Sequence, residues 1–535
     1  MSSEFDYIVV GAGSAGCIAA ARLARQASVL LIEAGNPAGR NPETLSADGF
    51  KYAFANDRLM WHRMTVPQAD CGGRSLYAGT GRGMGGSGGV NGMVYTRGDR
   101  CDFERWPRGW QWQDNEAAFE AIEQQMTVQP RWPTAFVKRF IQACEATGLR
   151  RKDHLNDGDL SAFVGCNDVN FADADRRSSY RAWLHDDRPA QLLCATDAQV
   201  QRLQFDADRR CTGVTYQDRQ GTHVATVRHE VILCAGALET PRLLMLSGVG
   251  PADHLASLGI DVVQDAPGVG ANLQDHPNVC LFYRSRVSVD FDYPQVYAFD
   301  QASRADTDPP CDPPDSCFVA YAAHASIKQS MLRMLPVLAL PGRLHDVLPL
   351  RLVLRGLIHC AFILPPLRWW VAKVFGIVVI LGKPTSRGSL RLASADPDTP
   401  ARIDPAIYAT EQDRDTLLAA VQKAKRIADS PAMREAGVRP LSAGGKTEDP
   451  SRIWRWVTAA TMTTFHFCGS CRMGDDDASP VDTELRVRGL QNVRVADASV
   501  FPEIPVSAIN APSMMVGYRA ADLILNSLTH HTETP

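Results

Sequence analysis

The chain opens with two short apolar runs on either side of a stretch of small residues. Residues 7–10 have the length and β-branched content of a buried parallel strand, and residues 28–32 form a second apolar run. Between them, residues 17–25 carry the small and mixed side chains typical of a helix. This order predicts a strand, a helix and a strand that ends directly before Glu33.

Later patterns predict further strands and helices. Residues 114–150 are expected to be largely helical, with Phe119, Ile122 and Met126 on one face. Strands are expected over 200–221, as a hairpin, over 231–236 and over 374–381, and a helix over 237–247. Strands and helices that alternate in this way predict the α/β fold class.

Length and composition narrow the class of protein. With 535 residues the chain is too long for one core, so we expect two domains, which need not be continuous in sequence. A hydrophobic content of 45% is that of a globular enzyme, and a net charge of -4 gives no reason to expect nucleic acid. The thirteen His are dispersed, so no metal site is predicted.

The cysteines favour a reducing compartment. Fourteen of them are scattered without the spacing of a disulfide framework, and the N-terminus lacks a charged-then-apolar signal. We therefore expect reduced thiols and a cytoplasmic location. Cys468 and Cys471 form one C-x-x-C pair, which we interpret as two ordinary small residues.

A glycine motif joins the first strand to the first helix. In Gly11-Ala12-Gly13-Ser14-Ala15-Gly16, the first glycine suits a tight turn, the second a close approach to pyrophosphate, and the third close helix packing. The helix N-terminus offers free amides to phosphates, and Glu33 is placed to accept hydrogen bonds from a ribose. The alternative is a purely structural turn. An acid at position 33 favours FAD or NAD over NADP.

A second stretch, residues 79–92, is glycine at eight of fourteen positions. Its backbone can adopt positive φ and approach a flat or charged ligand closely. A flexible linker is the alternative, but the apolar neighbours Met84, Val90, Met93 and Val94 argue against it.

Several motifs together resemble the GMC (glucose–methanol–choline) oxidoreductase family. They are the N-terminal unit, GRGMGGSGGVNGMVYTRG, GALETPRLLMLSGVGP, HFCGSCRMG, VDTELRVRGLQNVRVADASVFPEIP and NAPSMMVGYRAADLI. The resemblance implies FAD, oxidation of an alcohol, and a Rossmann-like FAD-binding domain interleaved with an α+β substrate domain on a mixed or antiparallel sheet. We assign 1–155, 190–285 and 455–535 to the first domain, and 156–189 and 286–454 to the second.

The resemblance also implies roles for single residues. His466 matches the family's catalytic histidine and is expected to act as the general base, while Asn510 is expected to orient the substrate oxygen. The expected cofactor-binding residues are Gly11, Gly13, Ser14, Ala15, Gly16, Glu33, Ala34, Arg82, Gly86, Ser87, Asn91, Gly92, Met93, Val94, Val200, Ala235, Gly236, Asp497, Ala498, Asn510, Ala511, Pro512 and Met514.

Two departures from the family pattern change the expectations. Phe467 and Gly469-Ser470 replace the usual Pro and Gly-Thr after the histidine, so substrate preference is not copied from any member. Val90 stands where some members carry a His that binds FAD covalently. Since valine forms no such bond, we predict non-covalent FAD.

Residues 328–381 are basic and apolar together. They hold one acid, Asp346, and seven basic residues: Lys328, Arg333, Arg343, Arg351, Arg355, Arg368 and Lys373. No run reaches the ~20 apolar residues of a membrane span. With Trp369 and Trp370, the segment resembles one that lies on the inner face of an anionic membrane, or alternatively an internal helical pair with a solvated basic face.

These features favour a dehydrogenase that passes electrons from a lipophilic primary alcohol to a quinone-like acceptor. An oxygen-using alcohol oxidase is one alternative. The others are non-oxidising homologues, of the hydroxynitrile lyase or fatty-acid photodecarboxylase type. Anaerobic bleaching of the flavin by alcohol separates oxidoreductases from a lyase.

Overall fold

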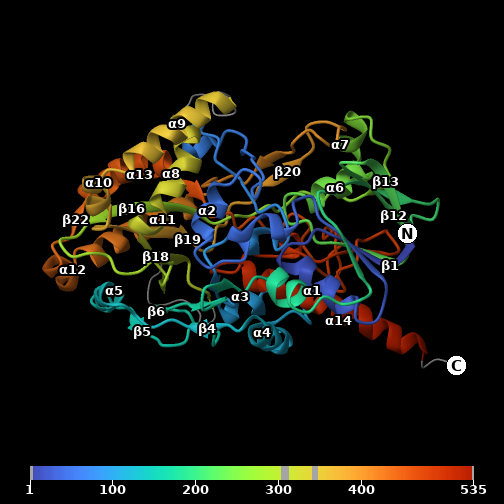
Figure 1. Ribbon diagram of the computed structural model, residues 1–535, viewed down its shortest axis with the longest axis horizontal. Helices are drawn as coiled ribbons and strands as arrows, with labels where there is room; N and C mark the ends of the chain where they lie inside the picture. The colour runs from blue at the N-terminus through green and yellow to red at the C-terminus, as the bar shows by residue number, and fades with distance from the viewer. Residues whose placement is uncertain (1–3, 303–311, 340–346, 533–535) are drawn as a thin grey trace.

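Seven strands form the first sheet of the computed structural model, which describes residues 4–302, 312–339 and 347–532 (Figure 1). In spatial order they are β10 (Leu192–Ala195), β2 (Val29–Ile32), β1 (Glu4–Val10), β13 (Gly221–Leu233), β12 (Cys211–Asp218) and β11 (Gln199–Phe205), with β24 (Val493–Val495) beside β13. The strands β10, β2, β1, β13 and β24 are parallel, and β12 and β11 are antiparallel. The α/β class and the opening strands are confirmed.

A second sheet of eight strands is almost wholly antiparallel. Its order is β22 (Arg439–Pro440), β16 (Pro277–Arg284), β19 (Val374–Leu381), β18 (Ser316–Ala322), β17 (Val296–Asp300), β6 (Phe163–Cys166) and β5 (Arg150–Arg151), with β23 (Met462–Thr463) beside β16. The predicted strand over 374–381 is confirmed, because β19 has these bounds and is almost entirely buried between β16 and β18.

The two sheets draw on alternating parts of the chain, so the domains interleave. Three strands of the second sheet lie in segments that were assigned to the FAD-binding domain: β5 within 1–155, β16 within 190–285 and β23 within 455–535. Residues 277–284 were assigned with the FAD-binding part, yet they form β16, a strand of the second sheet. The apolar residues of β16 pack in the core of the second sheet.

Helices cover both sheets and join the ends of the chain. α1 (Ser14–Leu23) packs along α14 (Asn510–Thr532), which places the two termini of the chain at the same end of the molecule (Figure 1). The predicted helical region 114–150 contains α4 (Trp112–Met126) and α5 (Ala135–Glu145), and the predicted helix over 237–247 is α6 (Thr240–Leu246). The other α-helices of the described residues are α2 (Phe50–Ala55), α3 (Arg100–Glu104), α7 (Ala252–Ser257), α11 (Glu411–Ala428), α12 (Pro431–Glu435), α13 (Pro450–Ala460) and the three helices of the cap. A π-helical turn, η5, covers Arg181–His185.

Short paired strands complete the described part of the chain. They are β3 (Val94–Tyr95), β4 (Gln129–Pro130), β7 (Asp168–Val169), β8 (Phe171–Ala172), β9 (Asp175–Arg176), β14 (Val249–Gly250), β15 (Gln264–Asp265), β20 (Ser389–Arg391) and β21 (Arg402–Asp404). The strands β3, β7 and β4 form a small sheet that anchors the end of the glycine stretch.

The chain between β18 and β19 leaves the second sheet as three helices, which we call the cap. They are α8 (Ala323–Ala339), α9 (Leu348–Ala361) and α10 (Pro365–Val371), and they lie at the end of the molecule away from the first sheet (Figure 1). Arg343 and Asp346 lie outside the described residues. No single described helix is long and apolar enough to cross a membrane. Taken together, α9 and α10 have the length and the apolar composition of a span, with a bend of 86° between them.

Three arginines of the cap turn inward rather than to solvent. Arg333 is almost fully buried and donates to Asp57 at 2.7 Å, and Arg355 donates to the same carboxylate at 2.8 Å. Arg351 lies 3.9 Å from it. The expectation of a solvated basic face is therefore wrong for these residues, because one acid just beyond α2 draws them to the protein.

Free thiols predominate in the described residues. Twelve cysteines are free, among them the buried pair Cys468 and Cys471, as expected of ordinary small residues. Cys101 is disulfide-bonded, so the expectation that every thiol is reduced is wrong at this position.

Candidate active site

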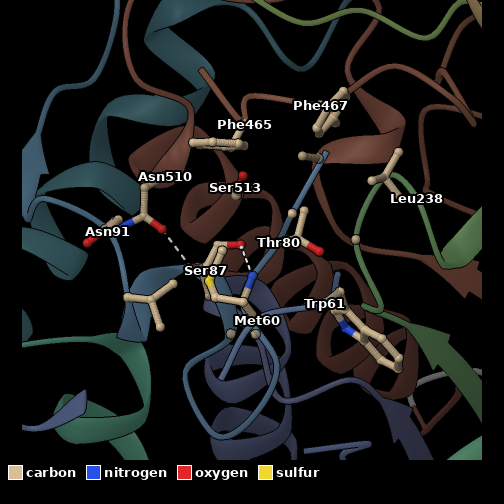
Figure 2. A pocket seen from close by; sticks show the side chains of 18 of the residues that line it. Met60, Trp61, Thr80, Ser87, Asn91, Leu238, Phe465, Phe467, Asn510 and Ser513 are labelled. Carbon is tan, nitrogen blue, oxygen red and sulfur yellow. Dashed lines mark hydrogen bonds between the residues drawn. The ribbon is translucent and has the colours of Figure 1, made fainter. Parts of the chain in front are cut away.

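A cavity of about 500 Å³ runs from the carboxyl ends of β1 and β2 to the edge of the second sheet. Figure 2 looks into it, with Ser87, Asn91 and Asn510 on its wall and the aromatic rings of Phe465 and Phe467 nearby. The first sheet, the glycine stretch, the loop before β24, the start of α14 and the cap all contribute lining residues.

The motif after β1 builds a concave end for this cavity. Gly11 has φ of +99°, and a Cβ there would lie 2.5 Å from the carbonyl oxygen of Cys234. A Cβ on Gly16 would lie 1.9 Å from the carbonyl oxygen of Gly11. By contrast, a Cβ on Gly13 would meet only Cys234, at 3.9 Å, and would otherwise project into open space.

The N-terminus of α1 faces this space without a side-chain cap. The N-cap residue is Gly13, which has no side chain to bond the free amides, and the first turn holds no acid. The amides there are the donors that a helix N-terminus offers to an anion. A pyrophosphate fits this end chemically, since the glycine leaves the room and the helix supplies donors.

Glu33 is buried at the end of β2, on the wall of the cavity. Its carboxylate accepts three backbone N–H groups, from Ala12 at 2.8 Å, Gly35 at 2.8 Å and Gly83 at 3.0 Å. Burial raises the pKa of Glu33, while these three hydrogen bonds oppose the shift. The acid thus ties the glycine stretch to the first motif, and its contact with a ribose stays a prediction.

A buried arginine holds the glycine stretch in shape. Arg176 donates to the carbonyl of Gly88 at 2.9 Å, and to the side chain and carbonyl of Asn91 at 2.8 and 2.7 Å. Burial lowers its pKa to about 9. Ser87 accepts from the amide of Gly81 at 3.1 Å, a bond drawn in Figure 2. The sequence analysis missed Arg176, because no local signal connects it to a loop 85 residues away.

His466 is buried on the cavity wall and paired with a second histidine. Its Nδ1 lies 2.9 Å from Nδ1 of His276, and Nε2 of His276 lies 2.9 Å from the carbonyl oxygen of Gly382. Burial lowers the pKa of His466 to about 4, and burial together with the neighbouring charges lowers the pKa of His276 well below its usual value. Both rings are therefore neutral at pH 7.

This chain of contacts assigns the protons. A carbonyl only accepts, so Nε2 of His276 carries the hydrogen and its Nδ1 is an acceptor. His466 must then donate from Nδ1, which leaves Nε2 of His466 with a free lone pair. The backbone N–H of His466 donates to the buried Asp275 at 2.8 Å, and the role of His466 as a base stays a prediction. The sequence analysis gave His276 no role.

Asn510 begins α14 and also lies on the cavity wall. Its side-chain oxygen accepts from the hydroxyl of Ser14 at 2.6 Å (Figure 2). The carbonyl side of the amide is therefore directed to α1, and the NH₂ group is left to donate. The two expected catalytic side chains, His466 and Asn510, line the same cavity.

Most of the expected cofactor residues lie on this wall. These are Gly11, Gly13, Ser14, Ala15, Glu33, Ala34, Gly86, Ser87, Asn91, Gly92, Val94, Val200, Ala235, Gly236, Asp497, Ala498 and Asn510. Val90 and Phe467, the two departures from the family pattern, also line it. The binding role of each side chain stays a prediction.

Six expected residues do not line the cavity: Gly16, Arg82, Met93, Ala511, Pro512 and Met514. Met93 is fully buried among apolar side chains, and Ala511 and Met514 lie in the main core. Arg82 stacks on Trp61 at 4.4 Å and donates to the carbonyl of Ala34. Helix α14 instead presents Ser513 to the cavity, since its neighbours face the core.

Further lining residues were not singled out by the sequence analysis, and most of them lie outside its motifs. They are Phe50, Lys51, Phe54, Met60, Trp61, Arg63, Thr80, Leu238, Glu239, Arg242, Pro294, Tyr297, Ser326, Gln329, Ser330, Thr464 and Phe465. Aromatic residues gather here, and three of these residues come from α8. No group of three or more His, Cys, Asp or Glu placed to hold a metal occurs in the described part of the chain.

Comparisons with known proteins agree with this geometry. Residues 5–278 and 384–517 match the two models of the GMC oxidoreductase family. The chain is 33% identical to an alcohol dehydrogenase [acceptor] of Pseudomonas putida, over 98% of this chain and 96% of that protein. It is 31% identical to choline oxidase of Arthrobacter globiformis, over 99% and 96%.

The fold agrees as well. Pyridoxine 4-oxidase from Mesorbium loti superposes with a TM-score of 0.82 at 26% identity, covering 97% of this chain and 99% of that one. The glycine cradle and the uncapped start of α1 fit a flavin dinucleotide. The chain therefore belongs to the GMC oxidoreductase family, as an FAD-dependent enzyme that acts on CH–OH donors.

Proposed function

We propose that the enzyme oxidises a lipophilic primary alcohol to an aldehyde, with His466 as the base, and passes the electrons to a quinone-like acceptor. The observation that carries the proposal is the neutral imidazole of His466, with Nε2 free, on the wall of a cavity that also presents the amide of Asn510.

The residues divide the work of one oxidation. The alcohol O–H proton passes to Nε2 of His466, and the Asn510 NH₂ group donates to the substrate oxygen and orients it. When bound, FAD supplies the hydride acceptor at flavin N5. The C–H and O–H bonds break and the C=O bond forms, so the substrate loses two electrons and two hydrogens.

The cavity wall supports a neutral, apolar substrate. Its three acids are all paired, since Glu33 accepts backbone amides, Glu239 bonds Arg63 and Arg242, and Asp497 bonds Gly236 and Thr240. No acid of the wall is therefore left to balance a cationic head group such as that of choline. The rings of Phe54, Phe465 and Phe467 provide apolar surface instead.

The remaining parts of the proposal have separate support. Val90 on the cavity wall supports non-covalent FAD, because a valine offers no nucleophile. The relative named alcohol dehydrogenase [acceptor] supports a dehydrogenase that acts on an alcohol. A cytoplasmic location, with contact to the inner face of an anionic membrane, belongs to the same proposal, and the apolar cap supports the contact.

Anaerobic mixing with alcohol tests the base. We expect His466→Ala to reduce the rate of flavin reduction at least ~10²-fold, the low end for general base catalysis. Phe467→Leu is the matched control, since it changes the adjacent cavity residue and leaves the imidazole. Equal rates for wild type and His466→Ala would exclude the assignment.

A substrate and acceptor series tests the rest. We expect reduction to be faster with 1-octanol than with 1-butanol, and slowest with choline. Turnover should be faster with a soluble quinone than with air. Flavin that stays on the protein after acid precipitation would show a covalent bond and contradict the role given to Val90.

A further inference from the structure

The cap carries an unusual exposed surface. Nine of the fifteen exposed large hydrophobic side chains in the described part of the chain lie between residues 347 and 370. They are Val347, Leu348, Leu352, Val353, Leu357, Ile363, Leu364, Trp369 and Trp370. We call these nine side chains the cap face. Apolar patches of this kind on a protein mark an interaction site.

The spacing along α9 gathers these side chains on one side of the helix. Leu348, Leu352, Val353 and Leu357 all lie on the solvent-exposed half of α9, whereas Ile358, on the opposite half, is buried. α10 continues the pattern with Trp369, which is 73% exposed, whereas Val371 is buried. Each helix therefore has an anchored side and a free apolar side.

Neither helix can cross a bilayer. At 1.5 Å per residue, the fourteen residues of α9 span about 21 Å and the seven of α10 about 10 Å, against about 30 Å of hydrocarbon. With a bend of 86° between them, their lengths do not add along one axis. Arg355 also ties α9 to Asp57 and to the carbonyl of Leu332. This geometry suits helices that lie flat in an interface.

Charge identifies the surface that would meet the cap face. The described residues from 323 to 373 include no acid, and Arg368 stands exposed beside the two tryptophans. Tryptophan and arginine together favour the boundary between lipid headgroups and acyl chains. Because Arg333, Arg351 and Arg355 are drawn to Asp57, the attraction to anionic lipid is left chiefly to Arg368 and Lys373.

The cap also borders the substrate cavity. Ser326, Gln329 and Ser330 of α8 line the cavity, opposite Phe50 and Phe54 of α2, and α9 packs on α8. One layer of helix thus separates the exposed apolar face from the space beside His466. A long-chain alcohol dissolved in a bilayer at the cap face would have only this layer to pass on its way to His466.

We infer that the cap face docks in the headgroup region of an anionic phospholipid bilayer and draws the alcohol from it. This inference rests on the proposed function: it names the surface that makes the membrane contact, and the delivery of substrate needs the oxidation of an alcohol. The partner is the lipid surface, and a second copy of this chain is the competing occupant.

Sedimentation of the FAD-loaded enzyme with vesicles tests the docking. With phosphatidylcholine containing 30% phosphatidylglycerol, we expect Trp369→Ser/Trp370→Ser to lower the partition coefficient at least ~10-fold, because two large apolar side chains leave the interface. Arg368→Gln/Lys373→Gln should lower it by roughly tenfold on the anionic vesicles and leave pure phosphatidylcholine unchanged.

Trp132→Ser is the matched control, since Trp132 is 79% exposed outside the cap. It should bind vesicles as wild type does. Equal binding by the cap variant and this control would overturn the proposal. So would a wild-type dimer, seen by light scattering, that the cap substitutions dissociate while vesicles recruit neither protein.

An activity arm separates docking from chemistry. Oxidation of dissolved 1-butanol should be unchanged in Trp369→Ser/Trp370→Ser, while oxidation of vesicle-borne hexadecanol should fall at least ~10-fold. If no alcohol is oxidised by wild type, the proposed function fails while the sedimentation result still decides the docking. If hexadecanol oxidation is unchanged in a variant that no longer binds vesicles, the delivery step is wrong.

Discussion

The two ends of the active-site cavity are held together in different ways. The cofactor end is shaped by backbone: glycines at close approach, the free amides of α1, and Glu33 accepting three N–H groups. The cap end is held by long side chains, with arginines from α8 and α9 converging on Asp57. Backbone contacts tolerate no added atom, whereas ion pairs tolerate rearrangement at a moderate cost.

The sharpest test of this contrast lies in two neighbouring glycines. We expect Gly16→Ala to cost ~3 kcal/mol or more of stability and to abolish flavin binding, because its Cβ would lie 1.9 Å from the carbonyl oxygen of Gly11. Gly13→Ala should keep the apoprotein's stability and weaken only the cofactor, since its Cβ projects into the cavity. Thermal unfolding and flavin absorbance after gel filtration measure both. Identical behaviour of the two variants would refute the steric account.

At the cap, removing a charge should have a smaller effect. Burial raises the pKa of Asp57, but the hydrogen bond from Arg355 and the charge of Arg333 outweigh it and keep that pKa below its usual value. We expect Asp57→Asn to lower the free energy of unfolding by about 1–2 kcal/mol, because Arg333 remains buried and Asp57 is partly exposed.

Limited proteolysis should locate the Asp57→Asn effect in α8 and α9, with flavin content unchanged. Asp48→Asn is its control, since Asp48 pairs with Lys51 on the surface. A loss of stability in Asp48→Asn as large as in Asp57→Asn would count against a specific role of Asp57 in holding the cap.

Between the two ends, His276 should set the proton position of His466. Replacing it by Leu removes the acceptor at Nδ1 and lets His466 take either tautomer, so we expect flavin reduction to slow by about tenfold with KM little changed. His276→Gln offers an acceptor oxygen and should restore part of the rate. A rise in KM alone would show that His276 only shapes the cavity.

Acid should destabilise the fold because His466 is buried in its neutral form. The pKa of His466 is about 4 in the folded state and near ~6.5 when unfolded, so the unfolded chain takes up a proton that the folded one refuses. The contribution of His466 is complete above about pH 6.5 and is lost as the pH falls to about 4. Asp275 acts in the opposite sense, because burial raises its pKa to about 7.

Comparison of wild type with His466→Gln isolates the imidazole from Asp275. Below pH 6 the unfolding free energy of wild type should fall more steeply, by up to about 1.4 kcal/mol per pH unit for the one proton. Parallel slopes, measured by urea titration at pH 7, 6 and 5, would show that the pKa of His466 is not lowered in the folded state.

The contrast also explains what the sequence could reveal. Gly11, Gly16 and the strands around them were predictable, because a turn and a close contact demand glycine at a set spacing. Asp57 and Arg333 lie 276 residues apart and carry no local signal, so the inward turn of the cap arginines was not predictable. Phe465 and Gln329 likewise reach the cavity only through tertiary packing. His276 was visible as a residue, but its role needs the distance to His466.

The bond between Ser14 and Asn510 also bears on how the enzyme is made. It joins residues 496 positions apart, so at the usual 5–20 residues per second the loop after β1 waits roughly 25–100 s for its partner to be synthesised. During that interval β1 first lacks its partner strand β13, and α14 is missing until the end of synthesis. The dinucleotide site is thus one of the last parts of the protein to be completed, although its first half leaves the ribosome before everything else.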